Sequence, residues 1–367
     1  MLTPLEIATC FLGVSVGRLG ASKKKNFSGL WITQLYPQGG HRGAAKRGRD
    51  VGNVARVDCM RIAVIQMKAE PDVEANLARI LKYIASGAAN GADLVVFPEA
   101  AMFPFDSGRL DTVAQPLDGP FAQAIIDTAK KHGTTAVVGM FTPAATVYRT
   151  PSGQLVEEQP SDSPEANQFR RVNNTLLVAG PDYVTHYDKI HTYDAFGYRE
   201  SDTVKPGKRR VVIDVGGVGV GLATCYDIRF PGHFVAMAAA GAKVMVVPSS
   251  WADGPGKLDQ WRELTAARAL DSASYLIAAG MARPGSPERY GTADGPTGIG
   301  HSVAIGPNGA RLAETGYAAQ VLTIDIDPNY VDKVRKNLPV LEGHRTDREL
   351  GVGVDLVGDV EEAQQLK

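Results

Sequence analysis

The sequence predicts an α/β domain built around sheets with mixed strand directions, and three patterns support this prediction. Short apolar or β-branched segments recur along the chain and are separated by helical segments with one apolar face. Some neighbouring strands are joined by helices and others by turns rich in Gly, Pro and Asn. The composition, with 44% hydrophobic and 22% charged residues, is typical of a globular domain.

The first half of the domain is expected to alternate strands and helices. Asp72 can cap the first helix, in which Leu77 and Ile84 fall on one apolar face. Gly133 is a stop signal for the second helix. The segment 145–170 is polar and rich in Pro, Ser and Glu, so we expect a loop there. The expected elements are strand 61–67, a helix after residue 72, strand 94–97, helix 120–132, strand 136–141 and a hairpin of strands 173–179 and 183–187.

The second half combines helical and hairpin connections. Gly216 and Gly217 allow a tight turn between two strands. Pro307, Asn308 and Gly309 form a second turn signal near the end of the domain. The expected elements are strands 210–214 and 218–224, helix 234–240, strand 243–247, helix 260–270, strand 275–279, and strands 301–305, 311–314 and 321–326.

Residues 1–59 differ from the domain that we place at 60–347. They hold two basic clusters, at 23–25 and 42–49, with few acidic residues and little periodicity. A signal peptide is not expected, because the positive charges follow the weak apolar stretch instead of preceding it. We predict a basic, poorly ordered leader, with a nucleic-acid-binding arm as the alternative. Residues 348–367 are assigned to a C-terminal tail.

Charge and cysteine content narrow the function classes. The formal net charge of -1 gives no reason to expect nucleic acid or a charged membrane as partner. No apolar run approaches the roughly 18 to 20 residues that span a bilayer. Three cysteines are an odd, sparse set that makes no disulfide framework, so the prediction is a reducing cytoplasm.

Several common catalytic signatures are missing from the sequence. No Cys/His cluster has zinc spacing, so no metal site is expected. Gly256-Lys257 is followed by Leu258, which does not fit a phosphate-binding loop. The glycines at 216–221 do not fit a dinucleotide fingerprint, and no Gly-x-Ser-x-Gly elbow occurs. An NTPase, a dehydrogenase or a serine hydrolase would each lack its usual signature.

Three polar residues occupy the ends of predicted strands. Cys225 ends an apolar run at a predicted strand-to-helix elbow, where helix amides favour a thiolate. Glu99 closes a short apolar strand, and Lys189 follows another. A cysteine nucleophile, a carboxylate base and an ammonium that holds an oxyanion, helped by the backbone N–H of Tyr226, make up a covalent hydrolase acting on a carbonyl.

Each of these residues also has a purely structural interpretation. A lone cysteine at a strand end is usually buried filler, and a lone glutamate after proline is usually a turn residue or a cap. An isolated lysine usually solvates a surface. Asp227 and Arg229 are expected to pair structurally at the elbow. The order and the local context of the three strand-end residues together carry more information than any one of them.

These contexts resemble the nitrilase superfamily of carbon–nitrogen hydrolases, from Met60 to about Asp347. The resemblance is carried by the three catalytic contexts in the same order and by later segments. They are Val96-Phe-Pro-Glu99, Tyr187-Asp-Lys-Ile-His191, Thr224-Cys-Tyr-Asp-Ile-Arg-Phe-Pro231, Val246-Val-Pro-Ser-Ser-Trp251, the helix around Trp261 and Arg268, Gly300-His-Ser-Val-Ala-Ile-Gly-Pro-Asn-Gly309 and Leu338-Pro-Val-Leu-Glu-Gly-His-Arg345. One departure follows the nucleophile, where Pro231-Gly232 replaces the Pro-Glu frequent in relatives.

The resemblance implies an α-β-β-α sandwich that dimerises through abutting sandwiches, and a catalytic triad of Glu99, Lys189 and Cys225. It also implies a second glutamate in the loop after the lysine. That position is assigned to Glu200, with Asp194 as the rival. The expected oxyanion- and substrate-binding residues are Tyr226, Ser249, Trp251 and Arg199. No metal or organic cofactor is required.

The implied reaction is hydrolysis of a small-molecule amide through a thioester. The nearest branch acts on ω-amides of dicarboxylic acids and on deaminated glutathione. True nitrilases and N-carbamoyl-amine hydrolases are the alternatives within the superfamily, and a catalytically silent scaffold is the alternative outside enzymology. Arg199 or Arg229 could bind a substrate carboxylate, with a structural ion pair as the competing role.

Overall fold

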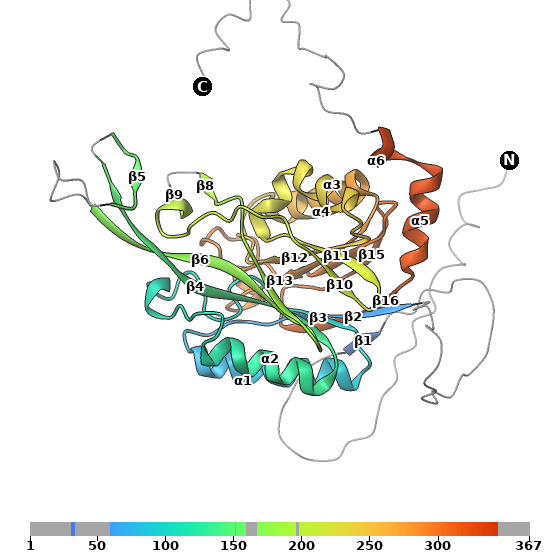
Figure 1. The fold of residues 1–367 in the computed structure, drawn as a ribbon, viewed down its shortest axis with the longest axis horizontal. Coiled ribbons are helices and arrows are strands. Elements are labelled where there is room, and N and C mark those ends of the chain that lie inside the picture. The colour runs from blue at the N-terminus through green and yellow to red at the C-terminus, as the bar shows by residue number, and fades with distance from the viewer. Residues whose placement is uncertain (1–30, 34–58, 151, 159–166, 196–197, 344–367) are drawn as a thin grey trace, which may run out of the picture.

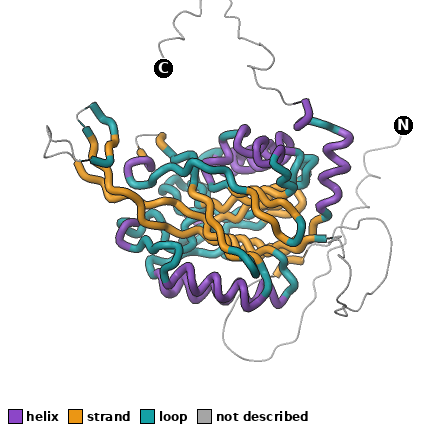
Figure 2. The backbone as a smooth tube through the Cα atoms, in the orientation of Figure 1, coloured by secondary structure: helices purple, strands orange, loops and turns teal. Residues whose placement is uncertain are grey.

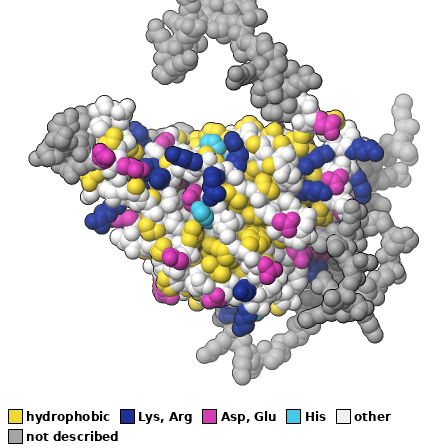
Figure 3. All heavy atoms as spheres, viewed as in Figure 1, with side chains coloured by type: hydrophobic (Ala, Val, Ile, Leu, Met, Phe, Trp, Pro, Cys, Tyr) yellow, Lys and Arg dark blue, Asp and Glu magenta, His cyan; other side chains and the backbone are white. Residues whose placement is uncertain are grey.

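The computed structural model describes residues 31–33, 59–150, 152–158, 167–195 and 198–343 (Figure 1). Strands form two mixed sheets in the interior, and helices cover them on two outer sides (Figure 2). On the face drawn in Figure 3, acidic and basic side chains are mixed with apolar ones. The predicted leader and tail lie outside the described residues, apart from Trp31–Thr33 and Cys59.

The first sheet has eight strands in the order β1-β16-β2-β3-β4-β6-β7, with β5 beside β4. The central strands β2, β3 and β4 are parallel, whereas β4–β6, β6–β7 and β16–β2 are antiparallel pairs. β1 lies within the predicted leader and runs parallel to β16 at the sheet edge. The strands are β1 (Trp31–Thr33), β2 (Met60–Gln66), β3 (Leu94–Val96), β4 (Thr135–Arg149), β5 (Leu155–Val156), β6 (Asn167–Ala179), β7 (Val184–Asp188) and β16 (Gln320–Ile326).

The second sheet has six strands in the order β10-β11-β12-β13-β14-β15. Its centre, β11 to β13, is parallel, and its flanks are antiparallel. A separate short ribbon pairs β8 (Asp194–Ala195) with β9 (Tyr198–Arg199). The strands of the second sheet are β10 (Val212–Val215), β11 (Val218–Leu222), β12 (Val244–Ser249), β13 (Tyr275–Gly280), β14 (Val303–Ile305) and β15 (Arg311–Glu314).

Side-chain alternation along the strands builds three apolar layers. In β2, Ile62 and Val64 face the second sheet, whereas Ala63 and Ile65 face the helices α1 and α2. A third layer joins the outer face of the second sheet to α3 and α4. The order α-β-β-α predicted from the resemblance is therefore confirmed (Figure 1). The helices are α1 (Val73–Ala89), α2 (Pro120–His132), α3 (Pro231–Ala239), α4 (Lys257–Ser272), α5 (Pro328–Asn337) and α6 (Val340–Gly343).

Local signals placed several element ends correctly. Asp72 caps α1 by accepting a hydrogen bond from the Ala75 N–H at 3.0 Å. Gly133 ends α2 in the left-handed conformation, with φ of 64°. The loop predicted for 145–170 is wrong at both ends, because β4 continues to Arg149 and pairs there with the start of β6. This ribbon projects beyond the helices, so it lacks the buried face that makes a strand recognisable from its pattern (Figure 1). The helices α5 and α6 were not predicted.

Candidate active site

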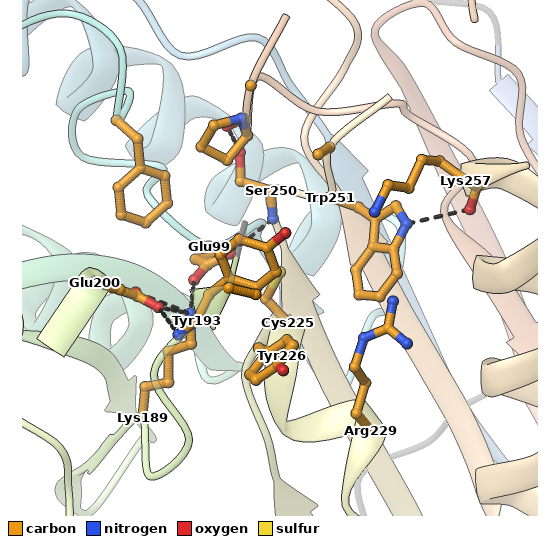
Figure 4. A pocket seen from close by; sticks show the side chains of 15 residues that line it. Glu99, Lys189, Tyr193, Glu200, Cys225, Tyr226, Arg229, Ser250, Trp251 and Lys257 are labelled. Carbon is orange, nitrogen blue, oxygen red and sulfur yellow. Dashed lines mark hydrogen bonds and ion pairs between the residues drawn. The ribbon is translucent and has the colours of Figure 1, made fainter. Parts of the chain in front are cut away.

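One cavity of about 290 Å³ opens where segments of the two sheets meet. Glu99 follows β3, Lys189 follows β7, and Cys225 comes three residues after the end of β11. The structure brings all three, together with Glu200, to the wall of this cavity. Figure 4 shows the two acids and Lys189 joined by hydrogen bonds and ion pairs beside Cys225.

Glu99 is held by close backbone packing and three hydrogen bonds. Gly139 of β4 lies against it, and a Cβ at that position would come within 2.5 Å of the Pro98 carbonyl oxygen and 2.9 Å of Glu99 Cα. The Glu99 Oε1 accepts from Asn174 Nδ2 at 2.8 Å and from Lys189 Nζ at 3.1 Å. Its Oε2 accepts from the Ser250 N–H at 2.9 Å. The buried carboxylate therefore has a single, well-defined orientation.

Lys189 lies between two carboxylates. Its Nζ is 3.1 Å from Glu99 Oε1 and 2.9 Å from Glu200 Oε1. All three residues are almost fully buried, at 1% exposure for Glu99, 3% for Lys189 and 4% for Glu200. Burial alone lowers the pKa of Lys189, but the charges of Glu200 and Glu99 outweigh it and raise the pKa well above its ordinary value. The site therefore holds Lys189 as an ammonium.

The sequence left two candidates, Glu200 and Asp194, for the second acidic residue, and the structure places Glu200 beside Lys189. Glu200 begins the 3-10 turn Glu200–Asp202 and accepts from the Tyr193 N–H at 2.6 Å in addition to Lys189. Asp194 is exposed in the β8–β9 ribbon, where it accepts from the Ser201 N–H at 2.9 Å. Glu200, and not Asp194, therefore contacts the lysine.

Cys225 starts the 3-10 turn Cys225–Arg229 with a left-handed backbone, φ 45°. This conformation is costly for a residue with a side chain, and strain of this kind concentrates at functional sites. Burial raises the pKa of the Cys225 thiol well above its ordinary value, and Glu99 raises it further by its charge and by a hydrogen bond, against the lowering effect of Lys189. The resting site thus favours a thiol over the thiolate expected from helix amides, because burial and Glu99 dominate.

The four predicted oxyanion- and substrate-binding residues divide into two pairs. Tyr226 and Trp251 line the cavity. Ser249 does not, since it ends β12 facing the interior and donates its hydroxyl to the Val247 carbonyl at 3.2 Å. Its neighbour Ser250 lines the cavity instead. Arg199 lies on the surface ribbon with 55% of its side chain exposed and is paired with Asp202.

Arg229, the other arginine that the sequence offered for binding a substrate carboxylate, lines the cavity. The predicted pair of Asp227 with Arg229 is not formed. Instead, the Arg229 guanidinium lies over Trp251, at 5.2 Å from the ring centroid, and donates to Gln260 Oε1 at 3.0 Å (Figure 4). No ion pair of Arg229 occurs within the described part of the chain. Lys257 lies on the same side of the cavity.

The remaining lining residues were not predicted individually from the sequence. Phe105 and Tyr193 add aromatic surface, and Pro296 closes one wall. Asn174 supports Glu99 from β6, and a polar side chain at an inward position of an apolar strand was the available signal. Among the described residues, no group of His, Cys, Asp and Glu is arranged to hold a metal ion. The helices in these ranges are all too short or too polar to cross a membrane.

Similarity to known proteins supports the same kind of chemistry as the site geometry. The carbon-nitrogen hydrolase family model matches residues 61–336. A Mycobacterium tuberculosis protein described as a hydrolase is 44% identical, with 77% of this chain and 94% of the relative aligned. The deaminated glutathione amidase of Escherichia coli O157:H7 is 31% identical over 78% of this chain and 97% of the relative.

Solved structures share the fold over a similar length. A double mutant of the amidase from Nesterenkonia sp. AN1, solved in complex with acrylamide, has a TM-score of 0.57 and 26% identity, covering 78% of this chain and 98% of that one. A Saccharomyces cerevisiae member of the nitrilase superfamily has a TM-score of 0.59 and 25% identity, covering 77% and 95%. The chain belongs to the carbon–nitrogen hydrolase family, within the nitrilase superfamily.

Proposed function

We propose that this protein hydrolyses a small linear amide through a thioester on Cys225. The observation that carries the proposal is the shared cavity, which a thiol lines together with a carboxylate that is itself paired with a buried ammonium. Relatives named deaminated glutathione amidase and omega-amidase, and the amidase solved with acrylamide, support amide chemistry. Nitriles and N-carbamoyl amines are the competing substrate classes.

The first half-reaction forms the acyl-enzyme. Glu99 accepts the proton of the Cys225 thiol as the sulfur attacks the amide carbon. The Lys189 ammonium and the Tyr226 N–H stabilise the oxyanion of the tetrahedral intermediate, and one such donor contributes on the order of 100- to 1,000-fold in rate. Glu99 then gives the proton to the leaving nitrogen, the C–N bond breaks, and ammonia or an amine departs. The acyl group stays on the sulfur as a thioester.

The second half-reaction hydrolyses the thioester with the same residues, and Glu99 again acts first as a base and then as an acid. Glu99 takes a proton from water, and the resulting hydroxide attacks the thioester carbon. The C–S bond breaks, the carboxylic acid leaves, and the proton on Glu99 returns to the Cys225 sulfur. Glu200 contributes by keeping Lys189 charged through both steps, since its carboxylate raises the pKa of that ammonium.

The shape and charge of the cavity support a short substrate with an anionic end. Its volume of about 290 Å³ suits a small molecule. Aromatic rings of Tyr193, Tyr226 and Trp251 form the walls, and Arg229 and Lys257 place positive charge away from the Glu99 cluster. A carboxylate at the far end of an amide would pair with the Arg229 guanidinium.

A cytoplasmic homodimer is part of the same proposal, and light scattering of the purified protein tests the dimer.

A substrate panel tests the proposal directly. Monoamides of short dicarboxylic acids, neutral amides of equal length, nitriles and N-carbamoyl amines are incubated with the protein, and ammonia is measured. We expect the wild-type protein to release ammonia from the anionic amides and Cys225→Ala to release none. In wild-type protein quenched with acid during turnover, intact-mass spectrometry is expected to show an acyl adduct that Cys225→Ala lacks. Equal inactivity of wild type and Cys225→Ala across the panel would favour the scaffold alternative.

A further inference from the structure

Asp227 joins the two chain segments that carry Lys189 and Cys225. Its Oδ1 accepts from the His191 N–H at 3.0 Å and from His191 Nδ1 at 2.7 Å. Its Oδ2 accepts from the Tyr187 hydroxyl at 2.6 Å and from the Thr224 N–H at 2.8 Å. Tyr187 and His191 stand two residues before and two residues after Lys189, and Thr224 directly precedes Cys225. One fully buried side chain thus contacts both catalytic segments.

This link matters because the two catalytic segments belong to different sheets. The Lys189 N–H bonds to the Asn174 carbonyl at 2.9 Å, which fixes the lysine to the first sheet. The Ala223 N–H bonds to the Val246 carbonyl at 3.1 Å, which fixes the elbow to the second sheet. Sheets stacked face to face are about 10 Å apart and share no backbone ladder. The separation of the ammonium and the thiol therefore depends on side chains that bridge the sheets.

The bridge requires an ionised carboxylate. Burial raises the pKa of Asp227, but the hydrogen bond from His191, the charge of His233 and the hydrogen bonds from Tyr187 and the Thr224 N–H outweigh it and lower the pKa. Both oxygens of Asp227 face donors. An asparagine carries one amide oxygen and one NH₂ group. In either orientation of its amide, the NH₂ group would face one of the two pairs of donors and could not accept from them.

We propose that Asp227 is a positioning residue that sets the separation of the Lys189 ammonium and the Cys225 thiol across the two sheets. The inference rests on the proposed cysteine mechanism, in which Lys189 must meet the oxyanion formed at the sulfur. Loss of the bridge lets the lysine segment move relative to the elbow, while Arg229, which would pair with a substrate carboxylate, keeps its hydrogen bond to Gln260.

Two measurements on full-length Asp227→Asn test this inference. The first is the pH dependence of Cys225 alkylation by iodoacetamide, followed by peptide mass spectrometry so that Cys10 and Cys59 are counted separately. Lys189 lowers the pKa of Cys225, so retreat of the ammonium is expected to move the alkylation midpoint upward by more than about 0.5 pH unit. The second is amide turnover, with kcat expected to fall about 100-fold and KM to stay within about threefold.

Asp188→Asn is the matched control. Asp188 adjoins Lys189 and accepts from the Thr175 hydroxyl at 2.7 Å, within the first sheet and away from the elbow. The alkylation midpoint and the kcat of Asp188→Asn are expected to stay close to the wild-type values. Equal midpoints and equal kcat in the two variants would overturn the inference.

A milder variant covers the case in which Asp227→Asn does not fold. Tyr187→Phe removes one donor from the lysine side of the bridge and is expected to shift the alkylation midpoint in the same direction, with kcat reduced about three- to tenfold. An unshifted midpoint in folded Tyr187→Phe would also overturn the inference. Alkylation needs no substrate, so a failure of the amide proposal would show separately as inactivity of the wild-type protein.

Discussion

Gly139→Ala should misplace the proposed base without touching the cavity. An added Cβ would lie 2.5 Å from the Pro98 carbonyl oxygen, 2.8 Å from the Ala100 nitrogen and 2.9 Å from Glu99 Cα. Ordinary contacts of this kind are about 3.4 Å or longer, so the Glu99 backbone must retreat by roughly 0.5 to 0.9 Å. All three atoms belong to the backbone, and no flexible side chain can absorb the overlap.

A displacement of this size has a predictable kinetic effect. A misplacement of about 1 Å costs on the order of 100-fold in rate, so we expect kcat/KM for amide hydrolysis to fall by roughly 30- to 100-fold. Overpacking should also lower the free energy of unfolding by about 1–3 kcal/mol. Glu99 raises the pKa of the Cys225 thiol, so its retreat should move the alkylation midpoint to lower pH, opposite to the shift expected for Asp227→Asn.

Gly316→Ala provides the comparison, because a Cβ at Gly316 meets nothing within 4 Å and its backbone is not left-handed. Steady-state kinetics, thermal unfolding and the alkylation profile are measured on both variants. If Gly139→Ala matched Gly316→Ala in kcat/KM and in midpoint, the close approach of β4 would not be what positions Glu99.

Two further predictions address specificity and pH. Arg229→Gln should raise KM for anionic amides about 10- to 100-fold and leave neutral amides nearly unchanged, whereas Arg199→Gln should behave as wild type in the same steady-state assay. Burial raises the pKa of Glu314, but hydrogen bonds from His301 and Arg262 outweigh it and lower the pKa from 4.5 to about 2. The folded state then binds this proton less readily than the unfolded state, so the stabilisation, on the order of 3 kcal/mol, is present above pH 4.5 and is lost as pH falls toward 2. Urea unfolding of Glu314→Gln should depend less on pH over that window, and an unchanged slope would contradict the assignment.

Local patterns were sufficient for most elements and insufficient where burial was missing. The helix cap at Asp72 and the stop at Gly133 depend on neighbouring residues, and both were predicted correctly. The outer part of the β4–β6 ribbon was missed because strands outside the core carry no apolar alternation. The neighbouring residues Ser249 and Ser250 show a related limit, since the predicted strand 243–247 ends before them and its pattern does not decide which of the two lines a cavity.

By itself, the sequence determined the fold class and singled out three residues of the proposed catalytic site, because apolar periodicity and the contexts of Glu99, Lys189 and Cys225 are local properties. The tertiary structure alone decided which acid meets the lysine, which arginine faces the cavity and that Asp227 bridges the two sheets. Lys189 and Glu99 are 90 residues apart, yet their side chains are 3.1 Å apart. Such distances depend on how two independently paired sheets pack against each other, and local periodicity in the chain does not encode that packing.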